Sequence, residues 1–376
     1  MLIAPWIFAS FAAALAYILL GYPLLLGVFS RFMRHPVQKS RQQPAVSAII
    51  AVYNGERFIA DKLRSLLELD YPRDKIEILV ASDGSSDRTE GIVEQFKDQG
   101  VRLLRLPHGG KCAALNAAIA QASGEILLLT DVRQTLAPGS LQFLVDCFAD
   151  PAVGVVSGEL VIRSGAGLEE AEAGLYWRYE FWIRKQLSGI DSIFGASGSI
   201  YAMRRSLAVP LPADMLLDDV YLPLAAFFRG YRLIVEPAAQ AFDFPTALDT
   251  EFRRKVRTLA GNYQILAAYP ALLGPRNRMW VHFVSYKLGR LLLPYLLAGL
   301  LISSFWLPGA WAPVALLAQA LFYGLAALDG FIPKNSALKK ISSPVRTFVV
   351  LILAAACATA ILFVPPRTLW KETKIA

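Results

Sequence analysis

The fold is decided between residues 46 and 87, where the chain reads VSAIIAVYN (46–54), ADKLRSLLEL (60–69) and IEILVASDGSSD (76–87). The first and third stretches are short, apolar and rich in β-branched residues, which is typical of buried strands in a parallel sheet. In the stretch between them, apolar residues recur at helical spacing. The three stretches therefore predict a strand, a helix and a second, parallel strand.

The alternation of strands and helices continues as far as residue 131. A helix is expected at about 87–98, a strand at 101–106, a helix of small residues at 111–122 and a strand at 125–131. This order predicts an α/β domain with a doubly wound, mostly parallel sheet. Ligands of such domains bind at the carboxyl ends of the strands. Three polar residues are expected at those ends, namely Asn54, Asp83 and Asp131.

The composition indicates a membrane protein with one large polar domain. Of the 376 residues, 55% are hydrophobic and 18% are charged, and the mean hydropathy is +0.43. Residues 2–29 carry no charge and are long enough to cross a hydrocarbon core of about 30 Å. Similar runs lie at about 291–307, 311–328 and 347–364, whereas residues 31–278 have the composition of a soluble protein.

We expect a membrane helix at 1–30, a cytoplasmic domain at 31–278, about three membrane helices at 279–366 and a tail at 367–376. The positive-inside rule supports this orientation in the cell (inner) membrane, because basic residues follow the first apolar run. A cleaved signal peptide is the alternative, but no basic residue precedes that run. The net charge of +8 favours membrane lipids over nucleic acid as partner, since the basic residues cluster beside apolar runs.

The Gly109-Gly110-Lys111 loop precedes an expected helix and favours an anionic ligand. A helix N-terminus stabilises a phosphate and disfavours a lysine, so an anion would explain the residue found there. Each acid at a strand end is ambiguous alone, because Asp83, for example, can also hold a turn or cap a helix. Together, the strand ends and this loop predict a nucleotide site.

Six motifs in order resemble the inverting family 2 glycosyltransferases with the GT-A fold. The branch that they resemble is membrane-embedded and includes the cellulose, chitin and hyaluronan synthases, and the resemblance covers about residues 46–262. The motifs are AVYNGE (51–56), SDGSSDRT (82–89), GGKCAALNAAI (109–119), TDVRQ (130–134), GASGSIYAMRR (195–205) and LLDDVYLPLAAFFRGYRL (216–233).

The resemblance implies a nucleotide-sugar donor, which we expect to be a UDP-sugar. Glu56 would lie near the nucleoside, Asp83 at the base and Lys111 at the pyrophosphate. Asp131 stands at the first acid of the metal-binding Asp-x-Asp motif, and a divalent cation normally neutralises the leaving pyrophosphate. The full set of expected donor-binding residues is Tyr53, Glu56, Asp83, Lys111, Asp131, Arg133 and Arg257.

The resemblance also implies a general base, Asp219, because the acceptor hydroxyl must lose a proton as the new bond forms. Backside attack by that hydroxyl inverts the anomeric configuration. An acid pair at a helix start is also stabilised by the helix dipole, which is the alternative for Asp218-Asp219. An aromatic stretch with helical spacing at 174–185 either packs in the core or forms a wall that faces the acceptor or lipid. The residues expected on the acceptor side are Gly198, Ser199, Asp218 and Trp177.

The chain departs from the family at Arg133, which replaces the second acid of Asp-x-Asp and cannot bind a cation. In one hypothesis, Asp131 still helps to bind a divalent cation (Mg²⁺ or Mn²⁺) or the ribose, and Arg133 contacts the donor phosphate or the sugar. The other hypothesis is a metal-free enzyme, in which Lys111, Arg133 and Arg257 neutralise the leaving group. Pairing of Arg133 with Asp131 or with a neighbouring acid is a third possibility.

A second departure concerns polymerisation. The Gln-x-x-Arg-Trp motif of the large synthases corresponds to Arg254–Thr258, in which Arg257 is kept and Thr258 replaces tryptophan. Threonine offers no flat face for stacking a sugar ring, which favours transfer of one sugar over processive synthesis. The surrounding basic helix, at about 250–267, is also expected to lie on anionic lipid.

The expected function is an inverting transfer of one sugar from a nucleotide sugar to a lipid-linked or cell-envelope glycan acceptor. A processive polysaccharide synthase with the same chemistry is the first alternative. A catalytically degenerate membrane scaffold is the second. It is disfavoured because the chain retains Asp83, Lys111, Asp131, Asp219 and Arg257.

Overall fold

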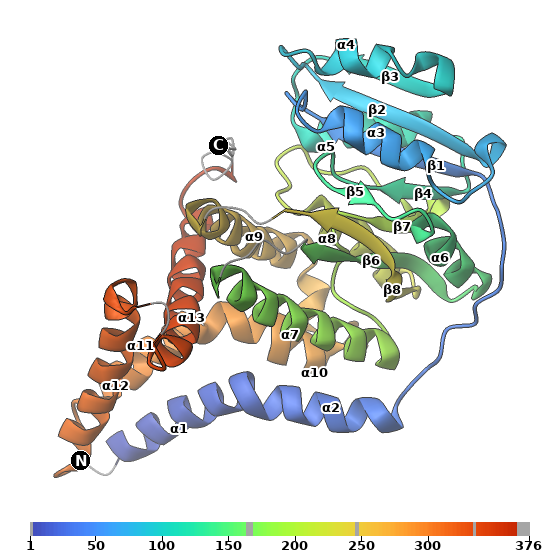
Figure 1. The fold of residues 1–376 in the computed structure, drawn as a ribbon. Helices are drawn as coiled ribbons and strands as arrows, with labels where there is room; N and C mark the ends of the chain where they lie inside the picture. The colour runs from blue at the N-terminus through green and yellow to red at the C-terminus, as the bar shows by residue number, and fades with distance from the viewer. Residues whose placement is uncertain (1–2, 163–167, 245–247, 334–335, 367–376) are drawn as a thin grey trace. The chain divides into compact units, whose positions relative to one another are not determined.

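The computed structural model forms two compact units (Figure 1). One unit comprises residues 30–165 and 179–245 and carries the sheet, and the other comprises residues 1–29, 166–178 and 246–376 and carries the long apolar helices. The residues that the structure describes are 3–162, 168–244, 248–333 and 336–366.

In the described residues, eight strands form one sheet in the order β3-β2-β1-β4-β7-β6-β8-β5. The first four strands in this order, β3, β2, β1 and β4, run parallel to one another, whereas β7 is antiparallel to both β4 and β6. The four strands expected between residues 46 and 131 are therefore parallel, as predicted, but they belong to a larger mixed sheet. The strands are β1 Val46–Val52, β2 Ile76–Asp83, β3 Val101–Leu106, β4 Ile126–Leu129, β5 Thr135–Leu136, β6 Val153–Ile162, β7 Tyr201–Arg204 and β8 Arg232–Asp243.

The helices of this unit cover the sheet. Helix α5 packs against β1 and β2, α6 packs against β8, and α3 packs against β5. The helix expected at about 87–98 is shorter, because α4 stops at Glu94 and a 3₁₀ turn, Lys97–Gln99, leads into Gly100 at φ +84°. The helix bounds are α3 Ile59–Leu67, α4 Thr89–Glu94, α5 Lys111–Gln121, α6 Ser140–Asp146, α7 Leu168–Ile190 and α8 Asp218–Phe228.

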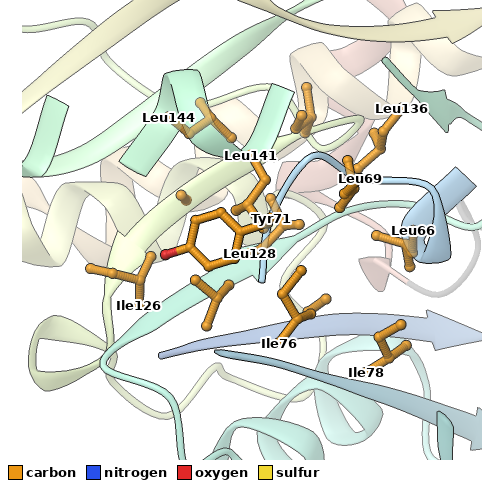
Figure 2. Packing of buried hydrophobic residues seen from close by; sticks show 14 of the residues in the cluster. Leu66, Leu69, Tyr71, Ile76, Ile78, Ile126, Leu128, Leu136, Leu141 and Leu144 are labelled. Carbon is orange, nitrogen blue, oxygen red and sulfur yellow. The ribbon is translucent and has the colours of Figure 1, made fainter. Parts of the chain in front are cut away.

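A core of buried side chains fixes where the strands end. Tyr71 lies among Leu141, Leu144 and the β4 residues Ile126 and Leu128 (Figure 2), and its hydroxyl donates to the Pro44 carbonyl over 2.6 Å. Because alternate residues of β4 point to this side, the strand is held in one register. The chain segment after β4 therefore leaves the sheet at a fixed position.

The second unit contains four helices that are long and apolar enough to cross a membrane, among the described residues. They are 21 to 29 residues long, which exceeds the roughly 20 residues needed for a bilayer. Helix α9, Leu248–Ala268, packs against α13, Lys339–Ala358, in the same unit. The four candidate spans are Ala4–Phe32 (α1 to α2), Trp280–Ser304 (α10 to α11), Trp311–Phe331 (α12 and a 3₁₀ turn) and Lys339–Leu362 (α13 and a 3₁₀ turn).

Candidate active site

Asp83 ends β2 and holds the Gly-Gly-Lys loop in place. Its buried carboxylate accepts hydrogen bonds from the backbone N–H of Gly109 over 2.7 Å and of Gly110 over 2.9 Å. Gly110 has φ +89°, a conformation that other residues rarely adopt, and α5 begins directly after it at Lys111. Thus Asp83 positions the start of α5, in addition to any contact with a ligand.

Tyr53 and His108 form an aromatic face beside Asp83. Their ring centroids are 4.6 Å apart, and His108 Nδ1 lies 3.0 Å from the Asp83 carbonyl oxygen. His108 could not be predicted as a site residue from the sequence, because a lone histidine before a glycine pair has no distinctive pattern. Glu56 lies nearby and accepts from the backbone N–H of Arg88 over 3.1 Å, so it joins the loops after β1 and β2.

Lys111 lies between two acids from different parts of the chain. Its Nζ is 2.8 Å from Asp131 Oδ1 and 3.0 Å from Asp218 Oδ1. Burial alone would lower the pKa of Lys111, but the two carboxylates outweigh it and raise that pKa well above its ordinary value. The lysine expected at the pyrophosphate is therefore charged, and it links the expected donor side to the acid pair of α8.

Asp219 faces the Gly-rich segment expected near the acceptor. Its Oδ2 accepts a hydrogen bond from the Gly198 N–H over 3.0 Å. Burial, and then the neighbouring charge of Asp218, raise the pKa of Asp219 to about 6. A carboxylate of this kind binds a proton more readily than an ordinary aspartate but is still mostly ionised at pH 7.

Gly198 lies between the carboxylates of Asp131 and Asp219. A Cβ added at Gly198 would lie 3.1 Å from Asp131 Oδ2 and 3.2 Å from Asp219 Oδ2. Both carboxylates therefore face the same Cα, and any larger residue would enter the space between them. In addition, the Asp131 N–H donates to the Gly198 carbonyl over 3.0 Å, and Ser199 is buried next to it.

Residues 47–209 match the family described as Glycosyl transferase family 2. These residues form a family 2 glycosyltransferase domain, in a chain that also has four helices long and apolar enough to cross a membrane among its described residues.

Two curated relatives are similar to about two thirds of the transferase. The poly-β-1,6-N-acetyl-D-glucosamine synthase of Staphylococcus aureus is 25% identical over 271 residues, which cover 66% of this chain and 65% of that one. The probable glycosyltransferase YdaM of Bacillus subtilis is 27% identical over 282 residues, which cover 69% and 66%. This chain thus spans slightly less than two thirds of the length of each relative.

A solved structure shares the fold of nearly the whole transferase. It is a mannosyltransferase from Pyrobaculum calidifontis in complex with GDP-Man and Mn²⁺, at a TM-score of 0.74 and 24% identity. The match covers 95% of this chain and 99% of that one. With the mixed sheet and the family match, it confirms the GT-A fold expected from the sequence.

Arg133 contacts the end of β8. Its Nε lies 2.8 Å from Asp243 Oδ1, at the end of β8, and its guanidinium also donates to the Phe244 carbonyl over 2.8 Å. The neighbouring Gln134 side chain donates to the other Asp243 oxygen over 2.8 Å. Of the possibilities considered for Arg133, pairing with a neighbouring acid is the one that the structure contains.

The acids of the transferase offer a divalent cation only a partial set of ligands. Among the described residues, no three His, Cys, Asp or Glu side chains are grouped so as to hold a metal. Asp131 presents one carboxylate, with Lys111 already on its Oδ1. These residues do not fit an all-protein metal cage. They do fit a Mg²⁺-like ion held by one carboxylate, substrate phosphates and water.

Two of the expected site residues, Arg257 and Trp177, belong to the second unit. Arg257 is on α9, which belongs to the second unit. The side chain of Trp177 is outside the part of the chain that the structure describes. The residues that the structure brings together within the first unit are Asp83, Lys111, Asp131, Gly198, Ser199, Asp218 and Asp219.

Proposed function

We propose that this transferase moves a sugar from a UDP-sugar to a lipid-linked or cell-envelope glycan acceptor with inversion, and that Asp219 is the general base. The observation that carries the proposal is the approach of Asp131 and Asp219 to the same face of Gly198. An acid on the donor side and a base on the acceptor side are thereby held a short distance apart, as an in-line displacement requires.

The donor would bind along the carboxyl ends of β1, β2 and β4. The Tyr53–His108 face suits stacking of a nucleobase, and Asp83 lies directly beside it. Lys111 suits the diphosphate because a buried lysine held by acids stays protonated and can stabilise the leaving group. Glu56 would act through the loop that it joins to Arg88.

In the transfer, the acceptor oxygen attacks the anomeric carbon while the bond from that carbon to the diphosphate oxygen breaks. The hydroxyl proton passes to the Asp219 carboxylate, and the electron pair leaves with the diphosphate. A pKa of about 6 suits this task, because Asp219 is ionised at pH 7 and yet is a stronger base than an ordinary aspartate. The Gly198 N–H orients Asp219, and Gly198 keeps the space open.

We propose Mg²⁺ or Mn²⁺ as the cofactor, with Asp131 as its ligand from this chain. Bound there, the ion would neutralise negative charge on the leaving diphosphate. Excess EDTA is expected to abolish consumption of the donor, and added Mg²⁺ or Mn²⁺ to restore it, as measured by release of nucleoside diphosphate. Full activity in EDTA would support the metal-free alternative instead.

A processive polysaccharide synthase is the second candidate, and one observation favours it. The similar staphylococcal protein is named as a synthase of a β-1,6-linked N-acetylglucosamine polymer. Against it stands Thr258 in place of the tryptophan of the polymerising enzymes. Product length separates the two candidates: a single added sugar supports the first, and a ladder of products supports the second.

The test of the proposal uses the full chain in detergent with UDP-N-acetylglucosamine, UDP-glucose and GDP-mannose in turn, and a membrane lipid extract as the acceptor. One of the two UDP-sugars is expected to release UDP and to give a product with inverted anomeric configuration by NMR, whereas use of GDP-mannose alone would contradict the proposed donor. A product with retained configuration would contradict the mechanism. If no nucleotide sugar were consumed, the degenerate scaffold would be the better account.

A further inference from the structure

Lys62 is fully buried at a position where an apolar residue would pack well. It lies on α3 beside Ile59, Leu63 and Leu66, whose side chains are also fully buried. Among the described residues, no carboxylate forms an ion pair with it. A buried charge without an ionic partner destabilises a fold, so its presence calls for a reason other than stability.

The ammonium group of Lys62 holds both ends of one loop. Its Nζ donates to Thr130 Oγ1 over 2.5 Å and to the Gln134 carbonyl over 2.6 Å. Between these two residues lies the Asp131-Val132-Arg133 triplet. A neutral apolar side chain of the same length would make neither contact.

The contacts continue from this loop to the proposed base. Thr130 Oγ1 donates to the Ser199 carbonyl over 2.6 Å, and the Asp131 N–H donates to the Gly198 carbonyl over 3.0 Å. Gly198 in turn donates its N–H to Asp219. A shift of the loop at Lys62 would therefore move Asp131 and the Gly198 segment together.

The charge of Lys62 also acts on the site. Asp131 is the charged group that faces it, and burial lowers the pKa of Lys62 to about 7 while Asp131 opposes that change. A negative diphosphate near Asp131 would favour the charged form of Lys62. The lysine therefore offers a positive charge behind the loop, close to neutral pH.

We infer that Lys62 is a positioning residue of the transfer site. It fixes the Thr130–Gln134 loop, and through Thr130 the Gly198–Ser199 segment, and it places a positive charge behind the bound diphosphate. The inference rests on the proposed function, because the diphosphate and the base are assigned there.

The first test measures anchoring without any substrate. Amide hydrogen exchange of the full chain in detergent is compared for Lys62→Met, Thr130→Val and Ser65→Ala. Ser65 is a matched control: it is buried on the same helix, and within the described part of the chain its hydroxyl donates only to the Lys62 carbonyl. Lys62→Met is expected to speed exchange at 130–134 and 198–199, with β2 unchanged and the melting temperature equal or higher. Unchanged exchange in those loops overturns the inference.

The second test separates positioning from packing by kinetics. With the donor that the wild-type protein consumes, Lys62→Met is expected to lower kcat/KM about 10- to 100-fold, while Ser65→Ala leaves it unchanged. The losses from Lys62→Met and Thr130→Val are expected to be less than additive in the double variant, since both break the contact between Lys62 and Thr130. Fully additive losses, or a Lys62→Met protein with full activity, overturn the inference while leaving the proposed function intact.

A pH series completes the comparison. The wild-type donor KM is expected to rise above about pH 7, as Lys62 loses its proton, and the KM of Lys62→Met to lack that rise. A lysine that served packing alone would give the same pH dependence in both proteins. If the wild-type protein consumes no donor, the proposed function fails, and the exchange experiment still decides whether Lys62 anchors the loop.

Discussion

Gly198 shows how closely single atoms determine this site. Gly198→Ala would place a methyl group 3.1 and 3.2 Å from two carboxylate oxygens, so the carboxylates or the loop must shift by a few tenths of an ångström. We expect kcat to fall about 10- to 100-fold with little change in melting temperature, because the reacting groups lose their alignment. Gly91→Ala is the matched control, since no atom lies within 4 Å of a Cβ there. Equal activities of the two variants would contradict the account.

The raised pKa of Asp219 is expected to affect activity and stability in opposite directions as the pH rises. Because the base must be ionised, kcat is expected to rise as the pH increases through about 6. Because the pKa of Asp219 in the folded protein lies above its ordinary value of 3.8, the folded protein holds the proton more tightly, and stability falls as the pH rises from about 3.8 to 6. At pH 7, Asp219→Asn is therefore expected to melt no lower than the wild type. A lower melting temperature would show that the Asp219 charge stabilises the fold.

The ion pair between Arg133 and Asp243 connects the loop after β4 to the end of β8. Asp243 is buried and pairs with Arg133, so Asp243→Asn leaves a guanidinium without its counter-charge. We expect a loss of about 3 kcal/mol in unfolding free energy, as for other buried pairs that lose one partner. Asp61→Asn, which breaks an exposed pair with Arg64, is expected to cost less than about 0.5 kcal/mol. Similar losses in both variants would contradict the buried role of Asp243.

The same elements show what could be predicted from the sequence. The β1-α3-β2 unit and the Gly-Gly-Lys start of α5 depend on local periodicity and on glycine, so the sequence analysis placed them within a few residues. The pairing of Arg133 with Asp243 could not be found in this way, because the two residues are far apart in the chain and meet only when β8 joins the sheet. Lys62 was equally hidden, since a lysine in an amphipathic helix is usually solvated.

At the scale of the whole molecule, the structure groups α9 with the membrane helices and ends the sheet unit at residue 245. The domain expected at 31–278 includes α9, and that boundary stays a prediction. Composition alone gives no boundary here, because a basic amphipathic helix is polar enough for a soluble domain and also suits a membrane surface.

We propose that the sheet unit is cytoplasmic, and cysteine labelling tests this orientation. Lys97 lies on an exposed turn of that unit, so a cysteine introduced by Lys97→Cys in a Cys357→Ser background offers a single accessible thiol, since Cys112 and Cys147 are buried. In bacterial spheroplasts, a membrane-impermeant maleimide is expected to label it only after lysis. Labelling of intact spheroplasts would place the unit on the opposite side of the membrane.

The account rests on Asp219 as the base, and the turnover rate of Asp219→Asn tests that claim most directly. The substitution keeps the size of the side chain but removes its capacity to take a proton. With saturating donor and lipid extract, kcat is expected to fall at least about 100-fold, while Asp61→Asn stays at the wild-type rate. An Asp219→Asn protein that folds normally and transfers sugar at the wild-type rate would contradict the account.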